Sequence, residues 1–182
     1  MAHRTVNKRA AAAATRAYLE RQQKEQEKKT QCVHIYTDAS YSHQTGIGAI
    51  AYIAVNDSEK ILMKHTSLVS KKKSYSNCTL LELLAIKEAV VSFKEKYAGD
   101  NNVTVVSDCK PVVESLSTGK RPKKQRFHAA FDILSAIPDI NYVYTKGHAT
   151  GSKRKTIYAK YNRQVDLMCR HKVKNELTRL TL

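Results

Sequence analysis

One short run of residues constrains the fold more than any other part of the chain. Val33 to Thr37 consists of β-branched and aromatic side chains, which is the composition of a β-strand. Asp38 follows, and then two small residues, Ala39 and Ser40. If the strand is central in a sheet and ends at Asp38, the carboxylate lies at the rim of the sheet, where it can hold a metal ion. Asp is also a common turn residue, so on this run alone Asp38 could simply begin a turn.

The rest of the chain predicts strands and helices in an order typical of an α/β domain. Further strands are predicted over residues 46–55, 60–68, 103–107 and 140–145. Helices, with apolar residues at helical spacing, are predicted over residues 79–97, 111–116, 128–137 and 162–178. Three antiparallel strands come first, and the later alternation of helices and strands requires parallel crossover connections. We therefore expect an α/β architecture, namely a mixed five-stranded sheet flanked by helices.

The charge of the chain is unevenly distributed. Its 182 residues carry a net charge of +16. Residues 1–30 contain eight Lys and Arg against three acids, residues 31–118 contain nine of each, and residues 119–182 contain fifteen against four. We expect a folded domain over residues 31–182 and a basic helical or disordered arm over residues 1–30, which either binds nucleic acid or a partner or only adds solubility. Basic ends favour a polyanionic ligand, and nucleic acid is the commonest of these.

Composition also argues against several classes of protein. No apolar run approaches the ~20 residues of a transmembrane helix, and the N-terminus lacks the apolar segment of a secretory signal. No basic segment has a strong apolar face opposite it, which argues against a membrane surface. The four cysteines are too far apart in sequence for a zinc site or a disulfide framework. We expect a cytoplasmic monomer with reduced thiols, no membrane association and no organic cofactor.

Four acidic residues fall at the ends of the predicted elements. Asp38 and Asp108 end two strands, Glu82 lies in the first turn of the first long helix, and Asp166 lies near the start of the last helix. If the two strands are neighbours, the four carboxylates approach one rim of the sheet and repel one another unless cations bind. Mg²⁺ suits such a set of oxygen ligands. Each acid also has an ordinary explanation: Glu82 in a capping box begun by Thr79, Asp108 as a helix N-cap, and Asp166 as a solvated helix residue.

An ordered set of motifs resembles type-one ribonuclease H over roughly residues 32–175. The motifs are Tyr36-Thr37-Asp38-Ala39-Ser40, Gly46-Ile47-Gly48-Ala49, Leu80-Leu81-Glu82-Leu83-Leu84-Ala85, Val106-Ser107-Asp108, Lys146-Gly147-His148-Ala149 and Asn162-Arg163-Gln164-Val165-Asp166. The resemblance implies that Asp38, Glu82, Asp108 and Asp166 are catalytic and bind two Mg²⁺ ions, with Mn²⁺ as a possible substitute. It also implies that His148 is a catalytic residue that assists water handling or product release.

The activity implied by this resemblance is endonucleolytic hydrolysis of the RNA strand of an RNA/DNA hybrid by a two-metal-ion mechanism, leaving 5′-phosphate and 3′-hydroxyl ends. Such an enzyme is expected to recognise the hybrid by its shape and its 2′-hydroxyls. The expected substrate contacts are Ser40, Asn77, Thr79, Lys120, Lys123, Lys153, Arg154 and Asn162. Two alternatives stay open: a non-catalytic hybrid- or RNA-binding module, and another nuclease of the same superfold, such as a resolvase, transposase or exonuclease.

Overall fold

The computed structural model describes residues 15, 16, 18, 32–69, 77–97, 102–146 and 157–181. The strands are β1 (Val33–Ser42), β2 (Ile47–Asn56), β3 (Ile61–Val69), β4 (Val103–Ser107) and β5 (Ile140–Tyr144). The helices are α2 (Cys78–Lys96), α3 (Lys110–Thr118), the 3₁₀ turn η2 (Gln125–Phe127), α4 (His128–Ser135) and α5 (Ile157–Thr181). The basic arm expected at residues 1–30 lies almost entirely outside the described residues, so the arm and the domain boundary stay predictions.

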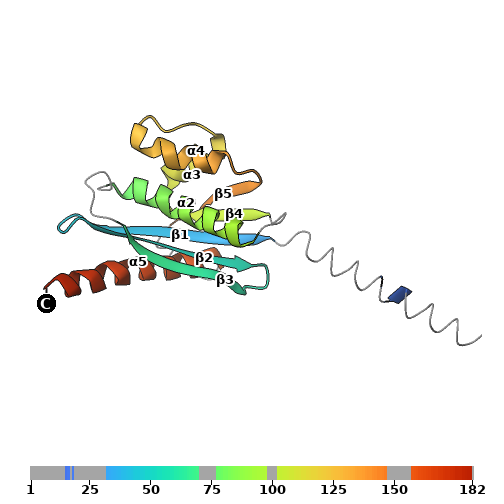
Figure 1. Ribbon diagram of the computed structural model, residues 1–182, viewed down its shortest axis with the longest axis horizontal. Coiled ribbons are helices and arrows are strands. Elements are labelled where there is room, and N and C mark those ends of the chain that lie inside the picture. Colours follow the sequence, from blue (N-terminus) through green and yellow to red (C-terminus); the bar gives the residue numbers. More distant parts are fainter. Residues whose placement is uncertain are drawn as a thin grey trace, which may run out of the picture.

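The five strands form one mixed sheet in the order β3-β2-β1-β4-β5, as Figure 1 shows. β1 and β3 pair antiparallel with β2, whereas β4 pairs parallel with β1 and with β5. The predicted mixed sheet and the predicted neighbourhood of the first and fourth strands are therefore confirmed. β2 is buried along its whole length, because both of its faces lie under helices.

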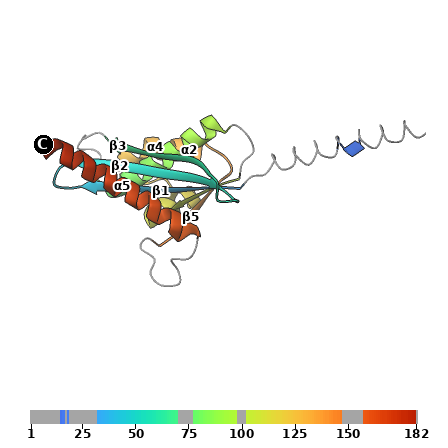
Figure 2. The same cartoon turned by 90° about the horizontal axis from the view of Figure 1, so that it is seen from below.

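Helices cover both faces of the sheet. α2 and α3 lie on one face with α4 beside them, and α5 runs along the opposite face (Figures 1 and 2). The larger core cluster fills the space between the sheet and α2, where Ile86, Val90 and Phe93 are at most 1% exposed. A second cluster joins the sheet to α5 through Tyr161, Val165 and Cys169. No helix among the described residues is long and apolar enough to cross a membrane.

β1 is longer than its sequence pattern indicates, and Asp38 does not end it. The parallel ladder with β4 stops at the pair Tyr36–Val106. The antiparallel ladder with β2 continues to the pair Ser42–Ile47. β1 therefore continues beyond the end of its pairing with β4, because it still pairs with β2. Asp38 lies inside the strand but beyond the end of β4, so it still reaches the rim that we expected.

The observed helix ends differ from the expected ones, and two of the ordinary explanations for the acids do not hold. α2 begins at Cys78 with Asn77 as its N-cap, so Thr79 and Glu82 form no capping box and Glu82 lies in the second turn. The N-cap of α3 is Cys109, which makes no side-chain capping bond, so Asp108 is not the cap. α5 begins at Ile157, ahead of the predicted start, which places Asp166 in its third turn. Packing of the added residues 157–161, including the buried Tyr161, extends this helix.

Candidate functional site

Three carboxylates meet at the rim of the sheet. Asp38, Glu82 and Asp108 each offer one oxygen, and these oxygens all lie within 4.8 Å of one another. The sheet register explains two of the three positions, because Asp38 and Asp108 each lie two residues beyond the paired Tyr36 and Val106. α2 packs on one face of the sheet and carries Glu82, the third member of the group. Among the described residues, this is the group whose donor atoms could together hold a metal ion.

Glu82 is the most buried member of the group, with 7% of its surface exposed. Its Oε1 accepts a hydrogen bond of 3.3 Å from the backbone N–H of Ala39. Its Oε2 is buried and has no hydrogen-bond partner within the described structure. A buried carboxylate oxygen without a partner is costly, and a cation at this point would remove the cost.

The same burial and crowding change the acidity of the group. Burial, and then the nearby Asp108 carboxylate, raise the pKa of Asp38 to about 7. Burial, and then the carboxylates of Asp38 and Asp108, raise the pKa of Glu82 well above its ordinary value. The three groups therefore resist ionising together in the absence of cations. An all-oxygen, negatively charged donor set fits a hard divalent cation.

Asp166 lies close to this group but is held by a different partner. Its Oδ1 lies 2.7 Å from Nε of Arg170 one turn later on α5, and 28% of its side chain is exposed. Its charge contributes to raising the pKa of Asp38, after burial and Asp108. The four predicted carboxylates thus face one rim, with three in mutual reach and Asp166 in an ion pair beside them.

Cys169 contacts the site, although the sequence indicated only a reduced thiol at this position. It is fully buried, and its Sγ donates a hydrogen bond of 3.1 Å to the carbonyl oxygen of Asp38. Burial, and then the charges of Asp38 and Glu82, raise the pKa of this thiol far above its ordinary value, so it stays a neutral donor. Cys109, next to Asp108, also has a raised pKa, about 11, through burial and then the charge of Glu82. The one signal in the sequence was that Cys169 follows Asp166 by three residues, on adjoining parts of one helix face.

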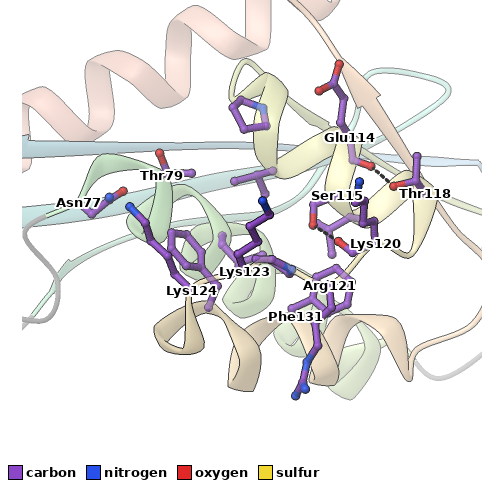
Figure 3. A pocket seen from close by; sticks show the side chains of 16 residues that line it. Asn77, Thr79, Glu114, Ser115, Thr118, Lys120, Arg121, Lys123, Lys124 and Phe131 are labelled. Atoms are coloured by element: carbon purple, nitrogen blue, oxygen red, sulfur yellow. Dashed lines mark hydrogen bonds between the residues drawn. The ribbon is translucent and has the colours of Figure 1, made fainter.

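Four of the predicted substrate contacts line one cavity, whose lining includes the start of α2, the helix that carries Glu82. Asn77 and Thr79 come from the start of α2, while Lys120 and Lys123 come from the segment after α3 (Figure 3). The cavity has a volume of about 740 Å³. Its apolar lining includes Leu83, Val112, Leu116, Phe127 and Phe131. Apolar walls with basic side chains around them suit a ligand that combines apolar surface with negative charge.

The other predicted contacts lie elsewhere. Ser40 is two residues after Asp38 on β1. Asn162 is one turn before Asp166 on α5, and its Oδ1 is buried without a hydrogen-bond partner within the described structure. Asn77 accepts a hydrogen bond of 3.2 Å from the backbone N–H of Leu80 through Oδ1, so this atom caps the N-terminus of α2. His148, Lys153 and Arg154 lie outside the described residues, and their roles stay predictions.

The chain matches the model of a known protein family. Residues 28–136, more than half of the chain, match the model of the RNase H-like domain found in reverse transcriptase. The matched segment contains Asp38, Glu82 and Asp108 and ends before α5. A search of curated proteins found no significant match.

Solved structures share the fold at low sequence identity. LC11-RNase H1, isolated from compost by a metagenomic approach, is 15% identical over 80% of this chain and 98% of its own, with a TM-score of 0.63. The same protein in complex with an RNA/DNA hybrid matches with a TM-score of 0.61 at 15% identity, over 80% of this chain and 99% of its own. The prototype foamy virus protease-reverse transcriptase is 19% identical over 78% of this chain and 20% of its own, with a TM-score of 0.59. At these identities the likeness establishes the fold.

Proposed function

Because the chain belongs to the family of RNase H-like domains found in reverse transcriptase, we propose that it is an endoribonuclease that hydrolyses the RNA strand of RNA/DNA hybrids. The products would be RNA ends with a 5′-phosphate and a 3′-hydroxyl. The observation that carries this proposal is the approach of Asp38, Glu82 and Asp108 to within 4.8 Å. Binding of nucleic acid alone needs no such cluster, and buried like charges make the metal-free fold less stable.

The proposed cofactor is a pair of Mg²⁺ ions. Asp38, Glu82 and Asp108 would hold these cations, together with Asp166 once it leaves Arg170. Bound divalent cations supply Lewis-acid stabilisation of the phosphate charge and lower the pKa of a water nucleophile. The Oε2 of Glu82 supports this assignment, because it is buried without a hydrogen-bond partner within the described structure. Its charged neighbours are the carboxyls of Asp38 and Asp108, which donate a hydrogen bond only when they are protonated.

The protein's own contribution is to hold the carboxylates and to orient the hybrid. Burial of Glu82 and its bond to the Ala39 amide fix one ligand before any cation arrives, so little reorganisation remains for the reaction itself. Lys120 and Lys123 beside the cavity would attract the phosphates of the DNA strand, and Thr79 would contact the backbone between the cavity and the carboxylates. We propose that His148 assists water handling or product release.

The proposal is tested with a labelled RNA/DNA hybrid beside duplex DNA and duplex RNA, in Mg²⁺ and in EDTA. We expect cuts only in the RNA strand of the hybrid, lost in EDTA and reduced at least about a hundredfold in Asp108→Asn. Asp57→Asn is the matched control, since the side chain of Asp57 is 60% exposed and lies outside the carboxylate group. Binding without cleavage in any divalent metal would favour the binding-module alternative. Cleavage of duplex DNA would favour another nuclease of the same superfold.

We further propose that the protein acts as a cytoplasmic monomer. Light scattering of the purified chain would measure its mass in solution, and a value of twice 20.5 kDa would contradict the monomer.

A further inference from the structure

A single peptide unit in β1 is bound by helices from both faces of the sheet. The unit joins Asp38 to Ala39. Its N–H donates to Oε1 of Glu82 on α2 at 3.3 Å. Its carbonyl oxygen accepts from Sγ of Cys169 on α5 at 3.1 Å. Since a peptide unit is planar, these two contacts together restrict the orientation of the backbone that carries the Asp38 carboxylate.

The position of this peptide in the sheet explains why such contacts matter. The ladder between β1 and β4 ends at Tyr36, so the Ala39 amide lies beyond the last β4 partner and binds Glu82 instead. Backbone geometry at the rim is therefore set by side chains from the helices as well as by the neighbouring strand β2. Cys169 is the side chain that supplies this contact from the α5 face.

Cys169 also lies close to Asp166 along α5. It follows Asp166 by three residues, so the two side chains project from adjoining positions on the helix. It is fully buried, as is Val165 one turn earlier. The contact from Cys169 to Asp38 thus directly links α5, which carries Asp166, to the residue of β1 that belongs to the carboxylate group.

We propose that Cys169 is a positioning residue that holds α5, and with it Asp166, at the separation from Asp38 that divalent-cation binding requires. The inference rests on the proposed function, because it assumes that these carboxylates bind cations. Without the thiol, apolar packing still joins α5 to β1 through side chains such as Val165 and Tyr161. Such packing is non-directional, so small shifts of the helix along the strand then meet less resistance.

The size of the effect follows from the bond that is lost. A hydrogen bond inside a protein contributes about 0.5–1.5 kcal/mol net, which corresponds to roughly a two- to tenfold change in an equilibrium constant. We therefore expect Cys169→Ala to weaken cation binding about fivefold. Cys169→Ser keeps a donor at nearly the same place and should restore the affinity to within about twofold of wild type.

The experiment measures Mn²⁺ binding by electron paramagnetic resonance, together with thermal melting and hybrid cleavage, for wild type, Cys169→Ala and Cys169→Ser. Val165→Ala is the matched control. Val165 is fully buried on the same helix and in the same apolar cluster, and its side chain has no hydrogen-bonding group. We expect Val165→Ala to lower the melting temperature as Cys169→Ala does and to leave the Mn²⁺ affinity unchanged. If Cys169→Ala does not fold, Cys169→Val, which also lacks a donor, takes its place in the comparison with Cys169→Ser.

Two results overturn the inference alone. One is wild-type Mn²⁺ affinity in the variant that lacks a donor, and the other is an equal loss in that variant and in Cys169→Ser. In both cases the wild-type protein binds Mn²⁺ and cleaves the hybrid, so the proposed function survives. A wild-type protein that neither binds Mn²⁺ nor cleaves the hybrid overturns the proposed function, and the inference with it.

Discussion

Replacing Asp38 by Asn should stabilise the metal-free protein while abolishing its proposed activity. The pKa of Asp38 rises from 3.8 to about 7 in the fold, mainly through burial and then through the charge of Asp108. At 1.36 kcal/mol for each pKa unit, ionising this carboxylate costs the folded state about 4 kcal/mol relative to the unfolded chain. Asn carries no charge, so Asp38→Asn should recover about 2–4 kcal/mol at pH 8, the range allowing for imperfect hydrogen bonding of the new amide.

The difference in stability between Asp38→Asn and wild type should depend on pH. Because the pKa of Asp38 is higher in the fold than in the unfolded chain, its favourable contribution to stability is complete below about pH 4 and is lost as the pH rises through about 7. The advantage of Asp38→Asn should therefore be small near pH 4, within about 0.5 kcal/mol, and should reach its full value by pH 8.

The assay is urea unfolding in EDTA at several pH values, followed by the same series in Mg²⁺. Cation binding to the native state should stabilise wild type more than Asp38→Asn, because the variant has lost a ligand, and so the difference between them should narrow. Asp57→Asn, at an exposed site, should stay within about 0.5 kcal/mol of wild type throughout. An Asp38→Asn variant that is less stable than wild type at pH 8 in EDTA would refute the electrostatic argument.

Three further predictions concern other parts of the structure. Lys123→Glu beside the cavity should weaken hybrid binding in EDTA about tenfold at low salt, and a filter-binding series should show that the difference shrinks as salt rises; a loss that does not depend on salt would contradict a phosphate contact. Arg170→Gln frees Asp166 from its 2.7 Å ion pair and should raise Mn²⁺ affinity about threefold in a resonance titration, whereas unchanged affinity would mean that the pair does not compete with the cation. Gly48→Ala places a Cβ 2.9 Å from Cδ1 of the buried Leu81 and should cost about 1–3 kcal/mol in urea unfolding, and a wild-type midpoint would show that this side chain moves aside freely.

Much of the fold could be predicted from local patterns. The β-former run at Val103–Ser107 is the strand β4, and the ordered motifs predicted the family that the sequence comparison confirms. The errors fall at element ends, where local patterns are weak. β1 outlasts its predicted end because β2 continues beside it to Ser42. α2 begins at an Asn77 cap rather than at Thr79, since both residue types can cap a helix and the sequence does not distinguish them.

The candidate site could be predicted in its residue types more fully than in its geometry. The sequence identified the four acids, and the structure brings Asp38, Glu82 and Asp108 together, while their catalytic role stays a prediction. The ion pair of Asp166 with Arg170 was not predicted, although an i, i+4 acid–base pair is visible in the sequence. The contact of Cys169 with Asp38 could not have been predicted, because a buried Cys at that helix position is also what an ordinary core requires.

By itself, the sequence determined the order of strands and helices, the uneven basic charge and the identity of the acidic residues, because these depend on composition and on short-range periodicity. Only the tertiary structure decided which of those acids share a site and how strongly burial changes their acidity. Those properties depend on contacts between distant segments. The Ala39 amide and Glu82 are 43 residues apart in sequence, and Asp38 and Cys169 are 131 apart. Such distances are fixed by the packing of α2 and α5 against opposite faces of one sheet, and no local pattern in the chain encodes them.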